Sequence, residues 1–252
     1  DRHRPCPMGT SGGHYLVSAG SNGGLCRDRE TGCLCIATNN HVGAYSNEAQ
    51  SGDLYLQPAI YDGGNIEKDA IGKLLRYIPL KFTSRQGNGS YKGLRNGLSQ
   101  IPFKLLSKRN LLAAIRSTKY NLIDAAAIEV DANNVSAEIL NIGTPKGIKD
   151  ARLDMYVQKS GRTTGHTKNG VITGIDATFG PISYGPGKSA YFKDQIVISK
   201  KGFSAGGDSG SFIMDMEGQA IGVLFAGNQT ENITIANPIK NYLDLLHVEL
   251  VT

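Results

Sequence analysis

One short stretch of the chain, Gly207-Asp208-Ser209-Gly210-Ser211, carries the residue types that nucleophilic catalysis needs. A serine hydroxyl is a poor nucleophile near neutral pH, so it needs a general base, and the oxyanion formed by its attack needs preorganised donors. Glycines beside Ser209 let the backbone bend so that the N–H groups of Gly207 and Ser209 point into one cavity. The stretch predicts a nucleophilic serine with an oxyanion hole. A surface turn is the alternative interpretation.

A candidate general base follows directly after an apolar, strand-like segment, in Thr38-Asn39-Asn40-His41-Val42. Histidine suits this role because an imidazole exchanges protons near neutral pH. The other four histidines lie in irregular, turn-rich or terminal segments: His3, His14, His166 and His247. His41 is therefore the favoured base, and a purely structural histidine is the alternative.

The base needs a buried carboxylate that fixes its tautomer and stabilises its cation. Asp124 is the best candidate because it lies within the apolar run 122–128, where a lone charge is costly to bury without a partner. A position at the start of the strand, in contact with water, is the alternative. The three residues occur in the order His41, Asp124, Ser209, and together they indicate nucleophilic catalysis more strongly than each does alone.

The composition indicates which elements must position these residues. Glycine accounts for 32 of 252 residues, which excludes a helical bundle and favours many strands joined by tight turns. Strand-like segments fall into two sets, separated by a connector rich in Gly, Pro and Lys at 143–151. The first set is 24–27, 33–38 and 122–130, and the second is 155–159, 170–175, 195–198, 211–214, 220–225 and 233–236.

Turn and helix signals complete this outline. Asn169-Gly170 lies between two strand-like segments and predicts a hairpin turn. One helix is expected at 107–118 and another at about 238–250, beginning on Pro238. The second helix is expected to place one apolar face inward: Ile239, Tyr242, Leu245 and Leu246.

At this point the sequence resembles the chymotrypsin-like (trypsin-like) serine endopeptidases, most closely their bacterial branch and the narrow-leaf-type trypsin-like peptidases. The resemblance rests on the His41, Asp124 and Ser209 motifs and on Ser160-Gly161-Arg162-Thr163-Thr164-Gly165. It extends through 224–227 and 235–239, and so covers nearly the whole chain apart from one basic segment. Animal digestive members usually have a cysteine directly after the catalytic histidine, whereas this chain has Val42.

The resemblance implies an all-β fold of two six-stranded antiparallel β-barrels with the site in the cleft between them. Residues 1–145 would form the first barrel, with His41 and Asp124, and residues 146–252 the second, with Ser209 and the C-terminal helix. By the same resemblance Ser209 is the nucleophile, His41 the general base and then acid, and Asp124 the residue that orients it. The amides of Gly207 and Ser209 form the oxyanion hole.

The resemblance also implies a cation for Asp208, the residue before the nucleophile. Bacterial relatives suggest that this cation is the arginine of the Gly-Arg-Thr-Thr-Gly hairpin. We therefore expect Arg162 to pair with Asp208 and to hold the oxyanion loop in its active form. An ordinary turn charge at Arg162 is the alternative.

The substrate pocket is expected, by the same resemblance, to have Phe203 at its base, next to Ser204, where some relatives have an acid. Its walls would come from Phe225, Ala226, Gly227 and Ile233. No carboxylate stands at these positions, so cleavage after Lys or Arg is not expected, and an apolar or small P1 residue is favoured. The alternative is that Phe203 packs in the core and the pocket is shaped elsewhere.

One segment carries the whole excess of positive charge. Residues 81–120 contain nine basic residues and no acidic one, so the remaining chain has 18 basic against 22 acidic residues, a net −4 against +5 overall. This partly helical insertion in the first barrel is a candidate site for an acidic partner or a regulatory domain. Nucleic acid is disfavoured because aromatic residues are sparse there. A solvated basic loop with a packed helix is the alternative.

The four cysteines lie within the first 35 residues, at Cys6, Cys26, Cys33 and Cys35. This clustering, with no visible leader, favours a reducing, cytoplasmic location, whereas a processed chain would allow secretion. A local Cys26–Cys33 disulfide stays open, and the spacing is not usual for zinc. No apolar stretch is long enough for a membrane span.

The predicted function is therefore peptide-bond hydrolysis through an acyl-enzyme, with a protein or peptide substrate and no metal or organic cofactor. The rival hypothesis is an interaction module that keeps the protease fold, inactive or gated by a partner, and binds through 81–120.

Overall fold

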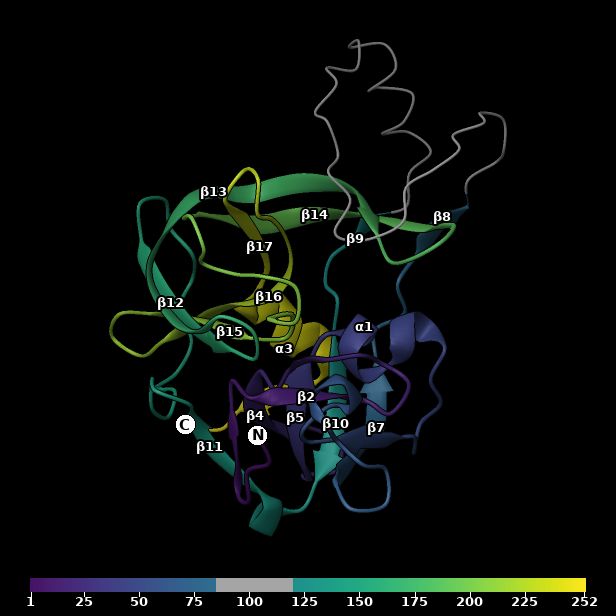
Figure 1. Cartoon of the computed structure of the whole chain (residues 1–252). Helices are drawn as coiled ribbons and strands as arrows, with labels where there is room; N and C mark the ends of the chain where they lie inside the picture. The colour runs from purple at the N-terminus through teal and green to yellow at the C-terminus, as the bar shows by residue number, and fades with distance from the viewer. Residues whose placement is uncertain (85–119) are drawn as a thin grey trace.

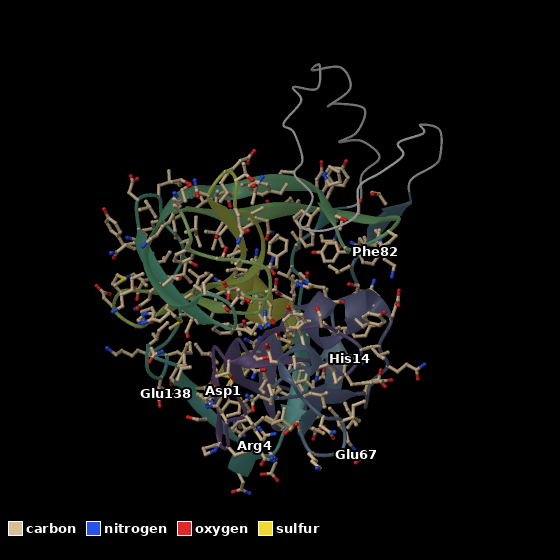
Figure 2. The ribbon with its side chains drawn as sticks, in the orientation of Figure 1. Asp1, Arg4, His14, Glu67, Phe82 and Glu138 are labelled. Carbon is tan, nitrogen blue, oxygen red and sulfur yellow. The ribbon has the colours of Figure 1, made fainter. Side chains whose placement is uncertain are left out.

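The computed structural model describes residues 1–84 and 120–252, which form two large β-sheets packed against each other (Figure 1). The expected helix at 107–118, and most of the basic segment 81–120, lie outside the described residues. Side chains lie on the faces of both sheets and in the region between them (Figure 2). None of the described helices is long and apolar enough to cross a membrane.

The first sheet contains eight strands in the order β18-β4-β5-β10-β7-β6-β2-β3, two more than the six expected. Its strands are β2 (Ser11–His14), β3 (Gly20–Ser21), β4 (Gly24–Asp28), β5 (Leu34–Thr38), β6 (Leu54–Leu56), β7 (Ala70–Tyr77), β10 (Ala126–Val130) and β18 (Val248–Leu250). A separate parallel pair joins β1 (Cys6–Met8) to β11 (Val135–Ile139). Short helical turns lie between strands: α1 (Asn40–Gly43), Tyr45–Asn47, Ile60–Asp62 and Ala132–Asn134.

The second sheet closes on itself. Six strands follow one another in the order β13-β12-β15-β16-β17-β14, and β14 pairs back onto β13. They are β12 (Tyr156–Gly161), β13 (Gly165–Ser183), β14 (Lys188–Ser199), β15 (Phe212–Asp215), β16 (Ala220–Asn228) and β17 (Ile233–Pro238). This ring is the six-stranded antiparallel barrel that the sequence predicts for the second half.

The strands β13 and β14 form a ribbon much longer than the predicted strands at 170–175 and 195–198 (Figure 1). The edge of β14 that faces away from β13 pairs in turn with β8 (Phe82–Ser84), β9 (Tyr120–Asn121) and β17. The described strands on either side of 85–119 therefore both pair with this ribbon of the second barrel.

The hairpin turn predicted at Asn169-Gly170 is wrong. The turn between β12 and β13 lies at Gly161–Gly165, and Asn169 and Gly170 sit inside β13, where the pairing with β12 shifts its register. Asn169 takes a positive φ of 57°. A Cβ on Gly170 would come within 2.7 Å of the Phe203 ring. This Asn-Gly pair therefore lies at an irregularity within a packed strand and does not reverse the chain.

The C-terminal helix α3 (Ile239–Leu246) is shorter than expected. It ends because His247 takes the left-handed conformation, with φ 60° and ψ 44°, after which β18 pairs with β4. The residues that it buries are Ile239, Tyr242, Leu243 and Leu246. Leu245, expected on the buried face, is 40% exposed, because the i, i+3, i+4, i+7 stripe passes through Leu243 instead.

None of the four cysteines is in a disulfide. Cys26 lies opposite Cys35 on β4 and β5, so the Cys26–Cys33 bridge left open by the sequence is not formed. Burial raises the pKa of Cys35 to about 12.

Candidate active site

The ends of two neighbouring strands bring His41 and Asp124 together. The antiparallel pairing of β5 with β10 places Thr38, the last residue of β5, opposite Ala126, the first of β10. His41 follows β5 in the short helix α1, and Asp124 precedes β10. The two side chains are therefore positioned from the same end of the first sheet.

The predicted pair of His41 and Asp124 is present. His41 Nδ1 lies 2.6 Å from Asp124 Oδ2, and the His41 backbone N–H donates to Oδ1 at 3.3 Å. The Asp124 side chain is fully buried and that of His41 is 23% exposed. An Nδ1–H that donates to the carboxylate leaves Nε2 as the acceptor on the exposed side. The Tyr184 hydroxyl also donates to Asp124 Oδ2, at 2.9 Å.

Two buried asparagines hold the peptide groups of Asp124. The Asn39 side chain donates to the Asp124 carbonyl oxygen at 2.8 Å, and the Asp124 N–H donates to Asn237 Oδ1 at 3.0 Å. Asn237 lies in β17 and in turn donates to Gln195 Oε1 at 2.7 Å. The sequence reasoning assigned neither asparagine a role. Their positions in or beside apolar strands could have indicated a role, because an amide side chain without a partner is costly to bury.

Ser209 belongs to the second barrel and contacts the first. Its carbonyl oxygen accepts a hydrogen bond from the Ser21 N–H at 2.8 Å. A Cβ on the neighbouring Gly210 would lie 2.4 Å from Thr38 Oγ1, three residues before His41. No hydrogen bond joins Ser209 Oγ to the His41 ring within residues 1–84 and 120–252. Such bonds are often long in the absence of substrate and tighten in the reacting complex.

The loop before Ser209 presents two free amides. The Asp208 N–H donates to the Ala205 carbonyl oxygen at 3.1 Å, whereas the N–H groups of Gly207 and Ser209 have no acceptor in the described part of the chain. Gly207 has a φ of 97°, and a Cβ there would lie 2.4 Å from Thr163 Oγ1. Two unpaired donors beside a serine hydroxyl can bind an oxyanion.

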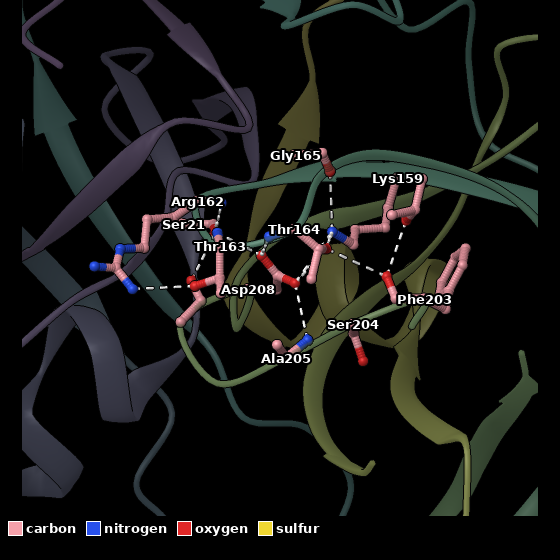
Figure 3. Close-up of polar contacts among 12 residues, drawn as sticks. Ser21, Lys159, Arg162, Thr163, Thr164, Gly165, Phe203, Ser204, Ala205 and Asp208 are labelled. Atoms are coloured by element: carbon pink, nitrogen blue, oxygen red, sulfur yellow. Dashed lines mark hydrogen bonds and ion pairs between the residues drawn. The ribbon is translucent and has the colours of Figure 1, made fainter. Parts of the chain in front are cut away.

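The ion pair predicted between Arg162 and Asp208 is wrong. The cation that contacts Asp208 is Lys159, whose Nζ lies 3.2 Å from Asp208 Oδ2, with both side chains fully buried (Figure 3). The hairpin itself does hold Asp208, through the backbone N–H groups of Thr163 and Thr164 at 2.8 and 3.1 Å to Oδ1. The Thr164 hydroxyl and the Ala205 N–H donate to Oδ2.

Lys159 is held on its other sides as well. Its ammonium donates to the Thr164 hydroxyl and, at 3.1 Å, to the Gly165 carbonyl oxygen. Burial lowers the pKa of Lys159, against the opposing effect of Asp208. The ammonium thus has two hydrogen-bond acceptors and, in Asp208, an ion-pair partner, as a buried cation requires.

The Arg162 side chain points away from Asp208 (Figure 3). It pairs with a different carboxylate, that of Asp62. Its Nε and Nη2 donate to the two oxygens of Asp62 at 2.7 and 2.6 Å, and its guanidinium lies 4.8 Å from the centre of the Tyr61 ring. Its backbone N–H still reaches the oxyanion loop, because it donates to Ser21 Oγ, which donates to the Gly207 carbonyl oxygen.

Phe203 does not line an open pocket. Its side chain is fully buried in the core of the second barrel, so the alternative interpretation of this residue is correct. The Ser204 hydroxyl lies beside the wall strands, 2.5 Å from Thr234 Oγ1. Ala226 and Ile233 are partly buried against the cluster that contains Phe225, and a Cβ on Gly227 would lie 3.5 Å from Ser204 Oγ.

A depression of about 350 Å³ lies beside His41. Its lining mixes apolar and hydroxyl-bearing side chains and contains no carboxylate: Leu16, Val17, Ser18, Ala19, His41, Tyr45, Ser46, Ile182, Ser183, Tyr184 and Phe225. Phe225 is thus the one predicted pocket residue that borders it. Among the described residues no group of three or more His, Cys, Asp or Glu side chains is placed to hold a metal ion.

No family model matches the sequence, and no curated protein matches it. Solved structures do match. Thermobifida fusca protease A superimposes with a TM-score of 0.60 at 18% identity, and 97% of each chain is covered. Cellulomonas bogoriensis chymotrypsin gives 0.58 at 17% identity, also over 97% of each chain. The fold is that of the chymotrypsin-like serine proteases.

A glutamic acid specific serine protease, described as using a histidine triad in substrate binding, shares this chymotrypsin-like fold. It has a TM-score of 0.61 at 16% identity, and the match covers 97% of this chain and 100% of that one. In this fold His41 and Asp124 lie next to strands β5 and β10 of the first sheet, and Ser209 lies shortly before β15 of the second.

Proposed function

We propose that the chain is a serine endopeptidase that hydrolyses peptide bonds through an acyl-enzyme. The observation that carries this proposal is the combination of the His41–Asp124 pair with two unpaired amides beside Ser209, within a chymotrypsin-like fold. No metal or organic cofactor is needed for this chemistry, since the base, the nucleophile and the oxyanion donors are all protein groups.

In the proposed mechanism His41 Nε2 takes the proton from Ser209 Oγ as the oxygen attacks the carbonyl carbon of the substrate. Asp124 keeps the Nδ1–H in place and stabilises the imidazolium that forms. The Gly207 and Ser209 amides donate to the oxyanion. His41 then gives the proton to the leaving amine, and water repeats the sequence on the ester. The buried Lys159–Asp208 pair keeps the two amides turned toward the substrate.

We further propose that the residue bound beside the scissile bond is apolar or small. No carboxylate stands at the predicted wall positions Phe225, Ala226, Gly227 and Ile233 or in the lining of the depression beside His41, so neither place offers a partner for a Lys or Arg side chain. Cleavage-site profiling on a denatured proteome measures this preference. A majority of cleavages after basic residues would contradict it.

The second candidate function is a protease-fold interaction module that is inactive or gated by a partner. The observation in its favour is that the Ser209 hydroxyl makes no hydrogen bond to His41 in the described residues. An acidic partner or regulatory domain at 81–120 stays a prediction, because 85–119 lies outside the described residues.

Labelling with a fluorophosphonate separates the two functions, because only an activated serine reacts at an appreciable rate. We expect labelling of the wild type at Ser209, none in Ser209→Ala or His41→Ala, and unchanged labelling in Ser51→Ala, which removes an exposed serine. With a peptide substrate, Ser209→Ala should lower kcat by about 10⁶-fold because triad residues act as a unit. Absence of labelling in the wild type, alone and with candidate partners, would favour the interaction module.

A further inference from the structure

The Asp124 carboxylate has a donor that neither the triad nor the neighbouring peptide groups supply. Its Oδ2 accepts from two groups, His41 Nδ1 at 2.6 Å and the Tyr184 hydroxyl at 2.9 Å. Oδ1 accepts the His41 backbone N–H at 3.3 Å. Tyr184 lies at the far end of the β13–β14 ribbon, 60 residues along the chain from Asp124. It comes from the second half of the chain, whereas the other donors come from the first.

The ring of Tyr184 is fixed by aromatic contacts on several sides. It stacks on Phe192 at 6.2 Å and meets Phe82 edge to face at 5.5 Å. It also meets the His41 ring edge to face, at 5.7 Å between centres. Phe192 is fully buried and packs on Phe225 at 4.5 Å. A ring held in this way cannot swing freely, so the position of its hydroxyl is set by packing.

The backbone at the ribbon end is also fixed. The Tyr184 N–H donates to the Lys188 carbonyl oxygen at 3.0 Å, and the Lys188 N–H donates to the Gly185 carbonyl oxygen at 3.2 Å. This closed turn joins β13 to β14. The backbone of Tyr184 is therefore held by a hydrogen-bonded turn.

The hydroxyl keeps its proton under the conditions in which the triad would work. Burial, and then the neighbouring Asp124 carboxylate, raise the pKa of Tyr184 well above its usual range. A neutral donor on Oδ2 disperses the carboxylate charge without competing as a cation. It also makes the carboxylate less able to take the Nδ1 proton when positive charge develops on His41.

We propose that Tyr184 is a positioning residue for the His41–Asp124 pair, holding Oδ2 in the orientation in which it receives the His41 Nδ1–H. The inference rests on the proposed peptidase function and adds a fourth side chain to its machinery. Tyr184 acts through Asp124, and within the described residues its hydroxyl makes no hydrogen bond to His41 or Ser209. Because it also borders the depression beside His41, its contribution must be separated from that of a simple pocket wall.

Tyr184→Phe removes only the hydroxyl and keeps the ring and its packing. The matched control is Tyr191→Phe on the same ribbon, since the Tyr191 hydroxyl makes no hydrogen bond to any described residue. We expect Tyr184→Phe to lower kcat by about tenfold to a hundredfold, well short of the roughly 10⁴-fold loss seen when the aspartate no longer orients the histidine. KM should change less than about twofold, and the control should match the wild type.

A second measurement does not depend on activity. The His41 Nδ1–H in a short bond to a carboxylate gives a low-field proton NMR signal, which is recorded in the inactive Ser209→Ala background. Adding Tyr184→Phe should shift or broaden this signal, and adding Tyr191→Phe should leave it unchanged. If Tyr184→Phe fails to fold, as judged by Tm, replacement of Tyr184 by 3-fluorotyrosine should shift the signal without removing the ring.

The outcomes distinguish failure of the proposed Tyr184 role from failure of the proposed peptidase function. An unchanged kcat with an unchanged proton signal would overturn the role of Tyr184, as would a change confined to KM, which is the effect of a pocket wall. If the wild type fails to react with a fluorophosphonate, the proposed function fails. The proton signal then still decides whether Tyr184 positions the pair.

Discussion

At the scale of single residues, Asp208 shows what a buried carboxylate beside a nucleophile requires. Three backbone amides, one hydroxyl and one ammonium donate to it. The sequence motif predicts the hairpin that supplies most of these donors but the wrong cation. Side chains two apart on a strand share a face, so Lys159 lies with Gly161 toward Asp208, while Arg162 in the turn points away. The strand sequence around Lys159 is mostly polar, so nothing local marks this lysine as buried.

One pair of variants can test that Lys159, and not Arg162, is the cation paired with Asp208. Lys159→Met leaves the Asp208 charge buried without a cation, and we expect it to lower the free energy of unfolding by about 3 to 5 kcal/mol and to abolish fluorophosphonate labelling. Arg162→Met breaks a partly exposed pair and should cost about 1 to 2 kcal/mol with labelling retained. Urea denaturation and labelling measure both. The reverse ranking would restore Arg162 as the cation of the oxyanion loop.

The Arg162–Asp62 pair should also show in the acid stability of the protein. The Arg162 guanidinium lowers the pKa of Asp62 below its usual 3.8. A carboxyl with a lower pKa in the folded than in the unfolded chain stabilises the fold above the unfolded value, and this stabilisation is lost as the pH falls through the folded value. The deficit of Arg162→Met relative to the wild type should therefore be largest above about pH 5 and shrink below about pH 4.

Urea denaturation of both proteins between pH 3 and 7 measures this difference. Arg152→Met is the control, because Arg152 is exposed and has no carboxylate partner among the described residues. A deficit that stays constant across the range would show that Arg162 stabilises the fold through packing on Tyr61 rather than through charge.

At the scale of elements, periodicity and turn chemistry located nine of the eighteen described strands, six of them in the second barrel. The segments at 24–27, 33–38, 211–214, 220–225 and 233–236 all fall within or next to β4, β5, β15, β16 and β17. What failed depends on tertiary packing. Whether Asn-Gly reverses the chain or bends a strand is decided by the Phe203 ring above Gly170. Helix α3 ends where it does because the chain after it forms β18, which pairs with the edge of β4.

The buried face of α3 gives a test that uses two adjacent leucines. Leu246→Ala removes a fully buried side chain and should lower the free energy of unfolding by about 2 to 5 kcal/mol. Leu245→Ala removes a 40% exposed side chain and should change it by less than about 1 kcal/mol, since little apolar area is lost. Equal losses, measured by urea denaturation, would mean that the helix packs on the face that the sequence predicted.

At the scale of the whole molecule, the two halves share one core. Phe212, Met214 and Val223 of the second barrel belong to the same buried cluster as Ile36 and Ile128 of the first sheet. Strands also cross the expected boundary at residue 145, because β18 joins the first sheet and β8 and β9 join the second. Local motifs in the sequence predicted His41, Asp124 and Ser209 as site residues, but such cross-connections have no local signal.

Because the halves share this core, we expect them to unfold together. Heating should give one transition in calorimetry, with a calorimetric enthalpy about equal to the van't Hoff enthalpy. Amide exchange in β5 and β15 should report the same opening free energy. Two resolved transitions, or a barrel that exchanges at much lower free energy than the other, would show that each half is a separate folding unit.

Because β8 and β9 both pair with β14, the length of the chain between them is not fixed by the packing of the two sheets. Ser84 pairs with Lys188 and Tyr120 with Tyr191, positions three residues apart on one strand, or about 10 Å. Since the chain leaves and returns at almost the same point, doubling the length of what lies between adds only about 0.6 kcal/mol of closure entropy. A sequence of another length can therefore replace residues 85–119 without moving the strands β8 and β9 that flank it on β14.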